Sequence, residues 1–148
     1  MQLYEQGKLD LDTDIRKYLD FDLITAYEQP ITMLNLMSHT PGFEDRSEGV
    51  FVRDRDQLIP LGEYLRSTQP VQIYPPGEIS AYSNYGAALA GYIVEQISGI
   101  PYEQYIEENI FQPLGMSRST FRQPVPSHLA GDLATGYRCA QSSACRVG

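Results

Sequence analysis

A largely apolar segment runs from Tyr85 to Ile97, and its large side chains repeat with the period of an α-helix. The bulky residues that share one side of this helix are Tyr85, Leu89, Tyr92, Ile93 and Ile97. The other side carries mostly small residues, namely Gly86, Ala87, Ala90, Gly91 and Val94. A helix that is apolar nearly all round is enclosed by protein on most sides, and small residues allow a close approach. We therefore predict a buried central helix.

Both ends of this helix carry recognisable signals. Ser83 is expected to cap the first turn, because its hydroxyl can accept from an unpaired backbone amide, and Gly99 is expected to end the helix. The rigid segment Pro75-Pro76-Gly77 predicts a turn shortly before it. Tyr82 and Asn84 flank the cap, so a well-held helix should present a phenol and a carboxamide at its start.

The remaining apolar periodicity is helical, with little sign of strand. Further helices are predicted at residues 2–8, 16–18, 33–37, 58–67 and 102–111. Asp12 or Thr13 is expected to cap the second of these and Thr32 the third. Residues 44–56 are charged and have little period, which indicates a surface loop. Short strands are expected only at residues 119–121 and 133–137.

Composition excludes several functional classes. The 148 residues are 42% hydrophobic and 20% charged, which is typical of globular protein. A net charge of −8 argues against a nucleic-acid partner, because phosphate binding needs clustered Lys and Arg. No apolar run approaches the length of about 20 residues that a transmembrane helix needs. The start of the chain does not have the pattern of a secretory signal, and the compartment is left open.

Several ordered motifs resemble the serine β-lactamase-related family. This family includes class C β-lactamases, D-Ala-D-Ala carboxypeptidases of the penicillin-binding-protein kind, and related esterases. The resemblance covers roughly residues 2–137, and the matching segments are residues 7–12, 36–43, 76–77, 82–86, 93–99 and 113–116. The family's proteins often lie in the periplasm or are secreted.

The resemblance implies a fold class and a domain division. The family's α+β fold joins an antiparallel sheet, made from both ends of the chain, to a helical subdomain. The present chain is expected to be a predominantly α-helical fragment of the β-lactamase/DD-peptidase fold, with most of the sheet missing. Residues 1–138 would form the partial domain and residues 139–148 a loose tail. Whether Cys139 and Cys145 form a disulfide stays open, and their spacing with His128 fits no usual zinc site.

The resemblance also implies a chemistry, which is acyl transfer through a serine nucleophile. Tyr82 would be the proton shuttle beside the nucleophile, and Asn84 would bind the amide carbonyl of the substrate. The substrate would be a β-lactam, a D-Ala-D-Ala peptide or a small ester, and neither a metal nor a cofactor is expected. From the residues alone, the alternative is that Tyr82 is a packing aromatic and Asn84 part of the helix cap.

The family's other two catalytic motifs are missing from the chain. Its lysines are Lys8 and Lys17, and the positions three residues before them hold Glu5 and Asp14, so there is no Ser-x-x-Lys. There is also no Lys-Thr-Gly or His-x-Gly. The pattern of the family would place the nucleophile just before Met1 and the late strand after the last residue.

We therefore expect these residues by themselves to be inactive. The alternatives are a non-catalytic binding module and a truncated product without function. Ser38 and His39 are adjacent in sequence, whereas catalytic partners usually come from separate segments, so this stretch is expected to be a structural turn near the site.

Overall fold

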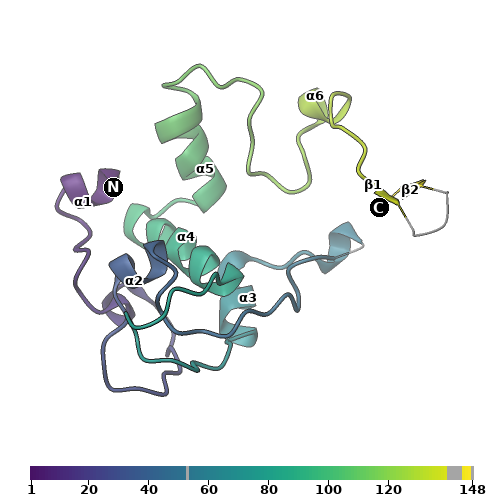
Figure 1. Ribbon diagram of the computed structural model, residues 1–148. Helices are drawn as coiled ribbons and strands as arrows, with labels where there is room; N and C mark the ends of the chain where they lie inside the picture. Colours follow the sequence, from purple (N-terminus) through teal and green to yellow (C-terminus); the bar gives the residue numbers. More distant parts are fainter. Residues whose placement is uncertain (53, 140–144, 148) are drawn as a thin grey trace. The chain divides into compact units, whose positions relative to one another are not determined.

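The computed structural model describes residues 1–52, 54–139 and 145–147. The chain divides into two compact units, Met1–Tyr105 and Ile106–Gly148. The first unit is helical, and its elements are α1 (Gln2–Glu5), η1 (Ile15–Tyr18), α2 (Met33–Met37), η2 (Arg55–Gln57), α3 (Leu61–Ser67), α4 (Asn84–Ser98) and most of α5 (Tyr102–Ile106) (Figure 1). Its described residues contain no strand, and two isolated bridges join Asp14 to Thr32 and Phe43 to Gln72.

Helix α4 is the centre of the first unit and contacts α2, α3 and η1 (Figure 1). The predicted bulky face is buried: the exposed fraction is 3% or less for Tyr85, Leu89, Tyr92 and Ile93. On the small-residue side, a Cβ built at Gly91 would lie only 3.5 Å from the ring of Tyr102, so the helix that follows approaches closely there. The prediction of a buried central helix is confirmed.

The predicted ends of α4 are also confirmed. Ser83 is fully buried, and its Oγ accepts a hydrogen bond from the amide of Gly86 at 3.1 Å. Gly99 adopts φ 74°, and its amide donates to the carbonyl of Glu95 at 2.9 Å. A left-handed residue turns the chain away from the helix axis, and glycine does so without steric cost.

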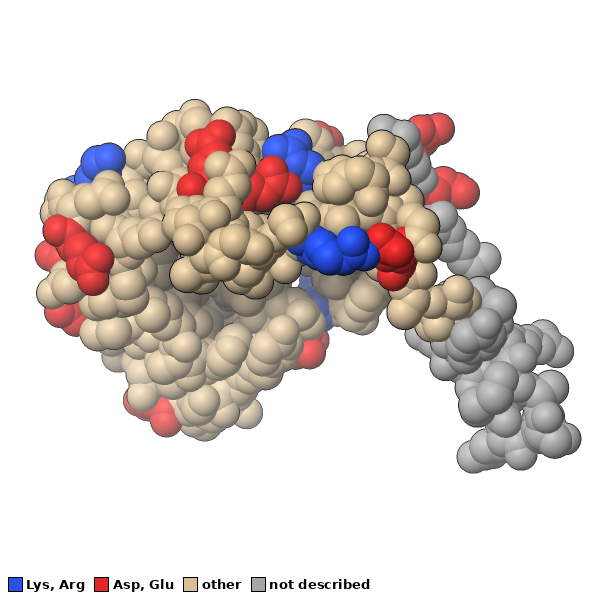
Figure 2. Space-filling view, turned by 90° about the horizontal axis from the view of Figure 1, so that it is seen from above, with Lys and Arg blue, Asp and Glu red and all other residues tan. Residues whose placement is uncertain are grey.

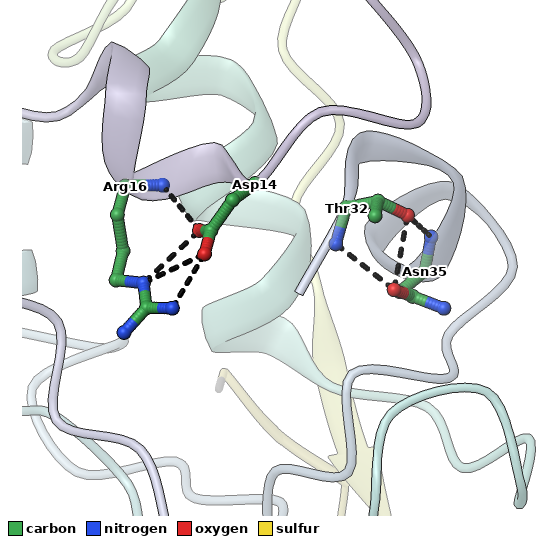
Figure 3. A network of polar contacts seen from close by, with 4 residues as sticks. All are labelled: Asp14, Arg16, Thr32 and Asn35. Carbon is green, nitrogen blue, oxygen red and sulfur yellow. Dashed lines mark hydrogen bonds and ion pairs between the residues drawn. The ribbon is translucent and has the colours of Figure 1, made fainter. Parts of the chain in front are cut away.

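The cap of η1 differs from the prediction. Asp14, rather than Asp12 or Thr13, is the N-cap, and its Oδ1 accepts from the amide of Arg16 at 2.9 Å. The Arg16 guanidinium also donates to this carboxylate, which holds the pKa of Asp14 below its usual value (Figure 3). A residue that binds both the backbone and the side chain of Arg16 gains two interactions, so it is favoured over its neighbours.

Thr32 caps α2 as predicted, and Asn35 completes a reciprocal capping box. The amide of Thr32 donates to Asn35 Oδ1 at 2.9 Å, and the amide of Asn35 donates to Thr32 Oγ1 at 3.3 Å (Figure 3). Two otherwise unpaired amides are thereby satisfied.

The helix predicted over residues 58–67 begins later, at Leu61. Pro60 is its N-cap, with φ −56° and ψ 147°, which is extended backbone. The residue before a proline is also disfavoured in helical conformation, so Ile59 cannot continue the helix backwards. Leu65 is fully buried in α3, whereas Leu58, outside the helix, is 42% exposed.

The second unit holds η3 (Glu107–Phe111), α6 (Ser127–Ala130), β1 (Tyr137–Cys139) and β2 (Cys145–Val147). The predicted helix over residues 102–111 is present, with a π-helical second half. Residues 119–121 are not a strand, so that prediction is wrong: Thr120 Oγ1 instead accepts from the amide of Arg122 at 3.0 Å, which forms a turn.

Strands β1 and β2 pair antiparallel, with Tyr137 opposite Val147. The predicted division at residue 138, with a loose tail after it, stays a prediction. The side chains of Cys139 and Cys145 lie outside the described residues, and with them the questions of a disulfide and of a metal site including His128.

The surface agrees with an acidic chain. Asp and Glu side chains are spread over the face shown in Figure 2, and the described residues on that face form no large cluster of Lys and Arg. Among the residues that the structure describes, no helix is long and apolar enough to cross a membrane.

Candidate functional site

Tyr82 and Asn84 lie at the start of α4, on either side of the buried Ser83. Ser83 has extended backbone, with φ −137° and ψ 118°. Neighbouring side chains point to opposite sides of an extended chain, so the residues that flank an inward Ser83 point outward. Accordingly, Tyr82 is 59% exposed and Asn84 is half-buried. The buried cap therefore fixes the direction of the two predicted site residues.

The two side chains meet directly. The hydroxyl of Tyr82 donates to Asn84 Oδ1 at 3.1 Å. Asn84 Nδ2 donates to Asp45 Oδ1 at 3.2 Å, and the amide of Asn84 lies 3.4 Å from the same oxygen. The sequence indicates only that Asp45 lies in a charged surface loop. Nothing in its local sequence indicates this contact, because 39 residues separate it from Asn84.

The ring of His39 contacts the ring of Tyr82. Their ring centroids are 4.7 Å apart, with 44° between the ring planes. The His39 carbonyl accepts from the amide of Ala81 at 2.8 Å, which ties this turn to the approach of α4. Its Nδ1 is buried and has no hydrogen-bond partner among the described residues. His39 has φ 54°, which is uncommon for a residue other than glycine and concentrates at functional and tightly held positions.

Ser38 does not form a catalytic pair with its neighbour. Its Oγ donates to the Leu34 carbonyl at 2.7 Å and lies 2.8 Å from Thr40 Oγ1, while the Ser38 carbonyl accepts from Ser80 Oγ at 3.1 Å. These bonds belong to a turn that packs beside the Tyr82 segment.

Gly42 joins this turn to the segment that leads to Tyr82. Its carbonyl accepts from the amides of Ile73 and Tyr74 at 2.8 and 3.2 Å. Gly42 has φ 84°, and a Cβ built on it would lie 1.9 Å from the carbonyl oxygen of Tyr74. The two segments can lie this close only because residue 42 has no side chain.

A pocket of about 250 Å³ opens beside Asn84. Its lining residues are Gly49, Val50, Tyr64, Asn84 and Ala88. Apart from Asn84, the side chains that line it are apolar or aromatic. A mostly apolar lining with one polar side chain is typical of small-molecule sites, which usually have larger volumes of about 300–1,000 Å³.

Tyr85, one residue further on, has a different environment. It is 2% exposed, and its hydroxyl donates to the Leu65 carbonyl at 3.0 Å. Burial raises the pKa of Tyr85 well above its ordinary value of 10.0. Removing the proton of a buried phenol is costly, so Tyr85 is a core packing residue. Tyr82, by contrast, is accessible to solvent.

The raised pKa of Tyr85 predicts how stability depends on pH. Above pH 10 the unfolded phenol loses its proton while the folded one keeps it, so the free energy of unfolding falls as pH rises. The fall amounts to at most about 1.4 kcal/mol per pH unit for one group. Urea unfolding at several pH values above 9 should show a shallower decline for Tyr85→Phe than for the wild type. Some decline should remain, because burial also raises the pKa values of Tyr92 and Tyr102. Equal slopes would contradict this assignment.

Comparisons with known proteins identify relatives along almost the whole chain. The model of the family described as Beta-lactamase matches residues 1–140. PbpX of Bacillus subtilis (strain 168) is 34% identical over 143 residues, which are 93% of this chain and 32% of PbpX. The D-alanyl-D-alanine-carboxypeptidase/endopeptidase AmpH of Escherichia coli (strain K12) is 32% identical over 127 residues, 82% of this chain and 32% of AmpH. The chain thus spans about a third of the length of these curated relatives.

Comparison with a solved structure also identifies the fold. The octameric penicillin-binding protein homologue from Pyrococcus abyssi superimposes with a TM-score of 0.80 at 26% identity, over 99% of this chain and 35% of that one. The predicted fold class, a largely helical part of the α+β β-lactamase/DD-peptidase fold, is confirmed. Since the family match and these likenesses extend over nearly all of its residues, the chain belongs to the Beta-lactamase family.

Proposed function

We propose that this chain is the helical part of a serine hydrolase that acts on small acyl compounds, with Tyr82 and Asn84 as its site residues. The observation that carries the proposal is the hydrogen bond between the exposed Tyr82 hydroxyl and Asn84 Oδ1, at the start of the buried helix α4. Membership of the Beta-lactamase family supports the reaction class.

In this proposal the two side chains have separate roles. The oxygen of a serine nucleophile bonds to the substrate carbonyl carbon, and the bond between that carbon and the leaving group breaks. The serine proton passes through the Tyr82 oxygen to the leaving group, and water then hydrolyses the ester bond of the acyl-enzyme. Asn84 binds the substrate's amide carbonyl through Nδ2, because a carboxamide nitrogen is a donor. The substrates proposed are a β-lactam, a D-Ala-D-Ala peptide or a small ester.

A polypeptide of these 148 residues is proposed to bind such a compound without reacting with it. The sequence holds the Tyr-x-Asn segment but neither Ser-x-x-Lys nor Lys-Thr-Gly. Without the activated serine there is no hydroxyl proton for Tyr82 to accept, and no acyl-enzyme forms.

Two measurements on this polypeptide test the proposal. Intact mass after incubation with excess penicillin, and separately with a fluorophosphonate, should show no adduct. Titration of the isotope-labelled chain with penicillin should shift the NMR resonances of Tyr82 and Asn84. Asn84→Ala should lose these shifts, and Tyr74→Phe, which alters a phenol on the preceding segment, should keep them.

The outcomes separate the two parts of the proposal. A stoichiometric adduct would show that one of the chain's own serines is activated and would overturn the predicted lack of reaction. Shifts that spare Tyr82 and Asn84, or that persist in Asn84→Ala, would overturn the assignment of the site.

A further inference from the structure

Asp45 is the charged side chain that contacts the Tyr82–Asn84 pair. One of its oxygens, Oδ1, lies 3.2 Å from Asn84 Nδ2 and 3.4 Å from the backbone nitrogen of Asn84. Asn84 is the first residue of α4, and its amide is among those that an α-helix leaves without an internal partner. Negative charge at this end of a helix is favourable. Asp45 therefore contacts both the backbone and the side chain of Asn84.

The chemistry of Asp45 determines which way the Asn84 carboxamide faces. An ionised carboxylate only accepts hydrogen bonds, so the carboxamide must present its NH₂ group to Asp45. Its oxygen then faces Tyr82, and the Tyr82 hydroxyl must be the donor in the 3.1 Å contact with Asn84 Oδ1. With a neutral amide in place of Asp45, the carboxamide of Asn84 could bind in either orientation.

The loop that carries Asp45 is anchored on both preceding residues. Phe43 is 2% exposed, and its ring meets that of Tyr85 edge-on, with centroids 5.4 Å apart. The amide of Glu44 donates to the Val71 carbonyl at 3.0 Å, and the amide of Val71 donates back to Glu44 Oε1 at 3.0 Å. These contacts hold the backbone of the loop beside the start of α4. The Asp45 side chain is exposed, but its backbone is held in place.

We propose that Asp45 is a positioning residue for the Tyr82–Asn84 pair. It holds the Asn84 carboxamide with its oxygen toward Tyr82, which directs the phenol hydrogen to Asn84 and leaves the phenol lone pairs free to accept a proton. Because Nδ2 carries two hydrogens, one can bind Asp45 while the other binds a substrate carbonyl. This role rests on the proposed function of Tyr82 and Asn84, which it refines.

The test compares Asp45→Asn with Glu48→Gln in the same 148-residue chain. Asp45→Asn keeps the shape of the side chain and an oxygen for the Asn84 amide, but it removes the acceptor-only character. Its free chain should show displaced NMR resonances for the side-chain NH₂ group of Asn84 and for the ring of Tyr82. Glu48→Gln removes an exposed carboxylate from the same loop and should leave both unchanged. Asp45→Glu, which retains a carboxylate, should restore part of the wild-type resonance positions.

Ligand binding is the second readout. Asp45→Asn should weaken penicillin binding about two- to tenfold, the range expected for the loss of one neutral hydrogen bond. An unchanged thermal midpoint, together with these shifts, would assign the effect to orientation rather than to folding.

Asn84 resonances that are the same in Asp45→Asn and the wild type would overturn the positioning role. The spectra of the free chain decide this without any ligand. If they change as expected but no form of the chain binds penicillin, the positioning role is supported and the proposed function fails.

Discussion

Replacement of Gly42 by alanine should lower the free energy of unfolding by about 2–5 kcal/mol. Two costs combine. The left-handed backbone conformation that alanine disfavours costs about 1–2 kcal/mol, and the crowding of a new methyl group costs about 1–3 kcal/mol. The second is severe here, because the methyl carbon would lie 1.9 Å from the Tyr74 carbonyl oxygen and this neighbour is backbone, which cannot rotate away. Urea unfolding monitored by circular dichroism would measure the loss.

Gly77→Ala is the matched control, because it isolates the conformational cost. Gly77 also has a positive φ, 88°, but the nearest atom to its built Cβ is Asn35 Nδ2 at 3.7 Å, an ordinary contact. We expect a loss of about 1–2 kcal/mol for this variant. If Gly42→Ala costs no more than Gly77→Ala, the close contact between residue 42 and Tyr74 is not present in solution.

Replacement of Leu89 by alanine should cost about 2–5 kcal/mol, the range for a leucine removed from a packed core. Leu89 is fully buried in the middle of α4. Alanine is the best helix former, so the loss would reflect packing and the residual cavity rather than helix propensity. Since α4 begins at Asn84 and Tyr82 directly precedes its N-cap, NMR resonances at the start of the helix should broaden as the helix loosens. The free energy of unfolding and these line widths are the measurements.

The control for this variant is Leu34→Ala in α2. Leu34 is 44% exposed, so the same chemical change removes much less buried surface. We expect a loss below about 1 kcal/mol, because surface substitutions usually have small effects. Similar losses for Leu89 and Leu34 would mean that α4 is not the centre of the core.

Local signals in the sequence predicted the parts of the fold that depend on neighbouring residues. The predicted helix caps are examples, because each bonds only to groups three or four positions away. The structure has all three as predicted: Ser83, Gly99 and Thr32. The cap of η1 was misplaced because Asp12, Thr13 and Asp14 are all suitable residues. Only the contact of Asp14 with Arg16 distinguishes them.

At the candidate site, the sequence likewise predicted only what depends on neighbouring residues. Tyr82 and Asn84 are two positions apart across an extended residue, so they are brought to the same side by the backbone itself. Their catalytic roles remain a proposal. The turn that contains His39 was expected near the site, but its ring contact with Tyr82 was not. Asp45 could not be found from the sequence, since it reaches the pair through a loop whose course depends on Phe43 packing against Tyr85 and on Gly42 meeting Tyr74.

Polar contacts between residues far apart in the sequence show most clearly what the sequence alone could not predict. The Tyr92 hydroxyl donates to Asp20 Oδ1 at 2.8 Å across 72 positions, and Arg66 contacts both groups. Hydrophobic periodicity predicts that Tyr92 is buried but cannot specify the partner of its hydroxyl. The sequence alone determined the central helix, its ends and the Tyr-x-Asn pair, because these depend on backbone geometry over a few residues. Only the tertiary structure decided which distant carboxylate and ring flank that pair, because closing long loops depends on the packing of the whole unit.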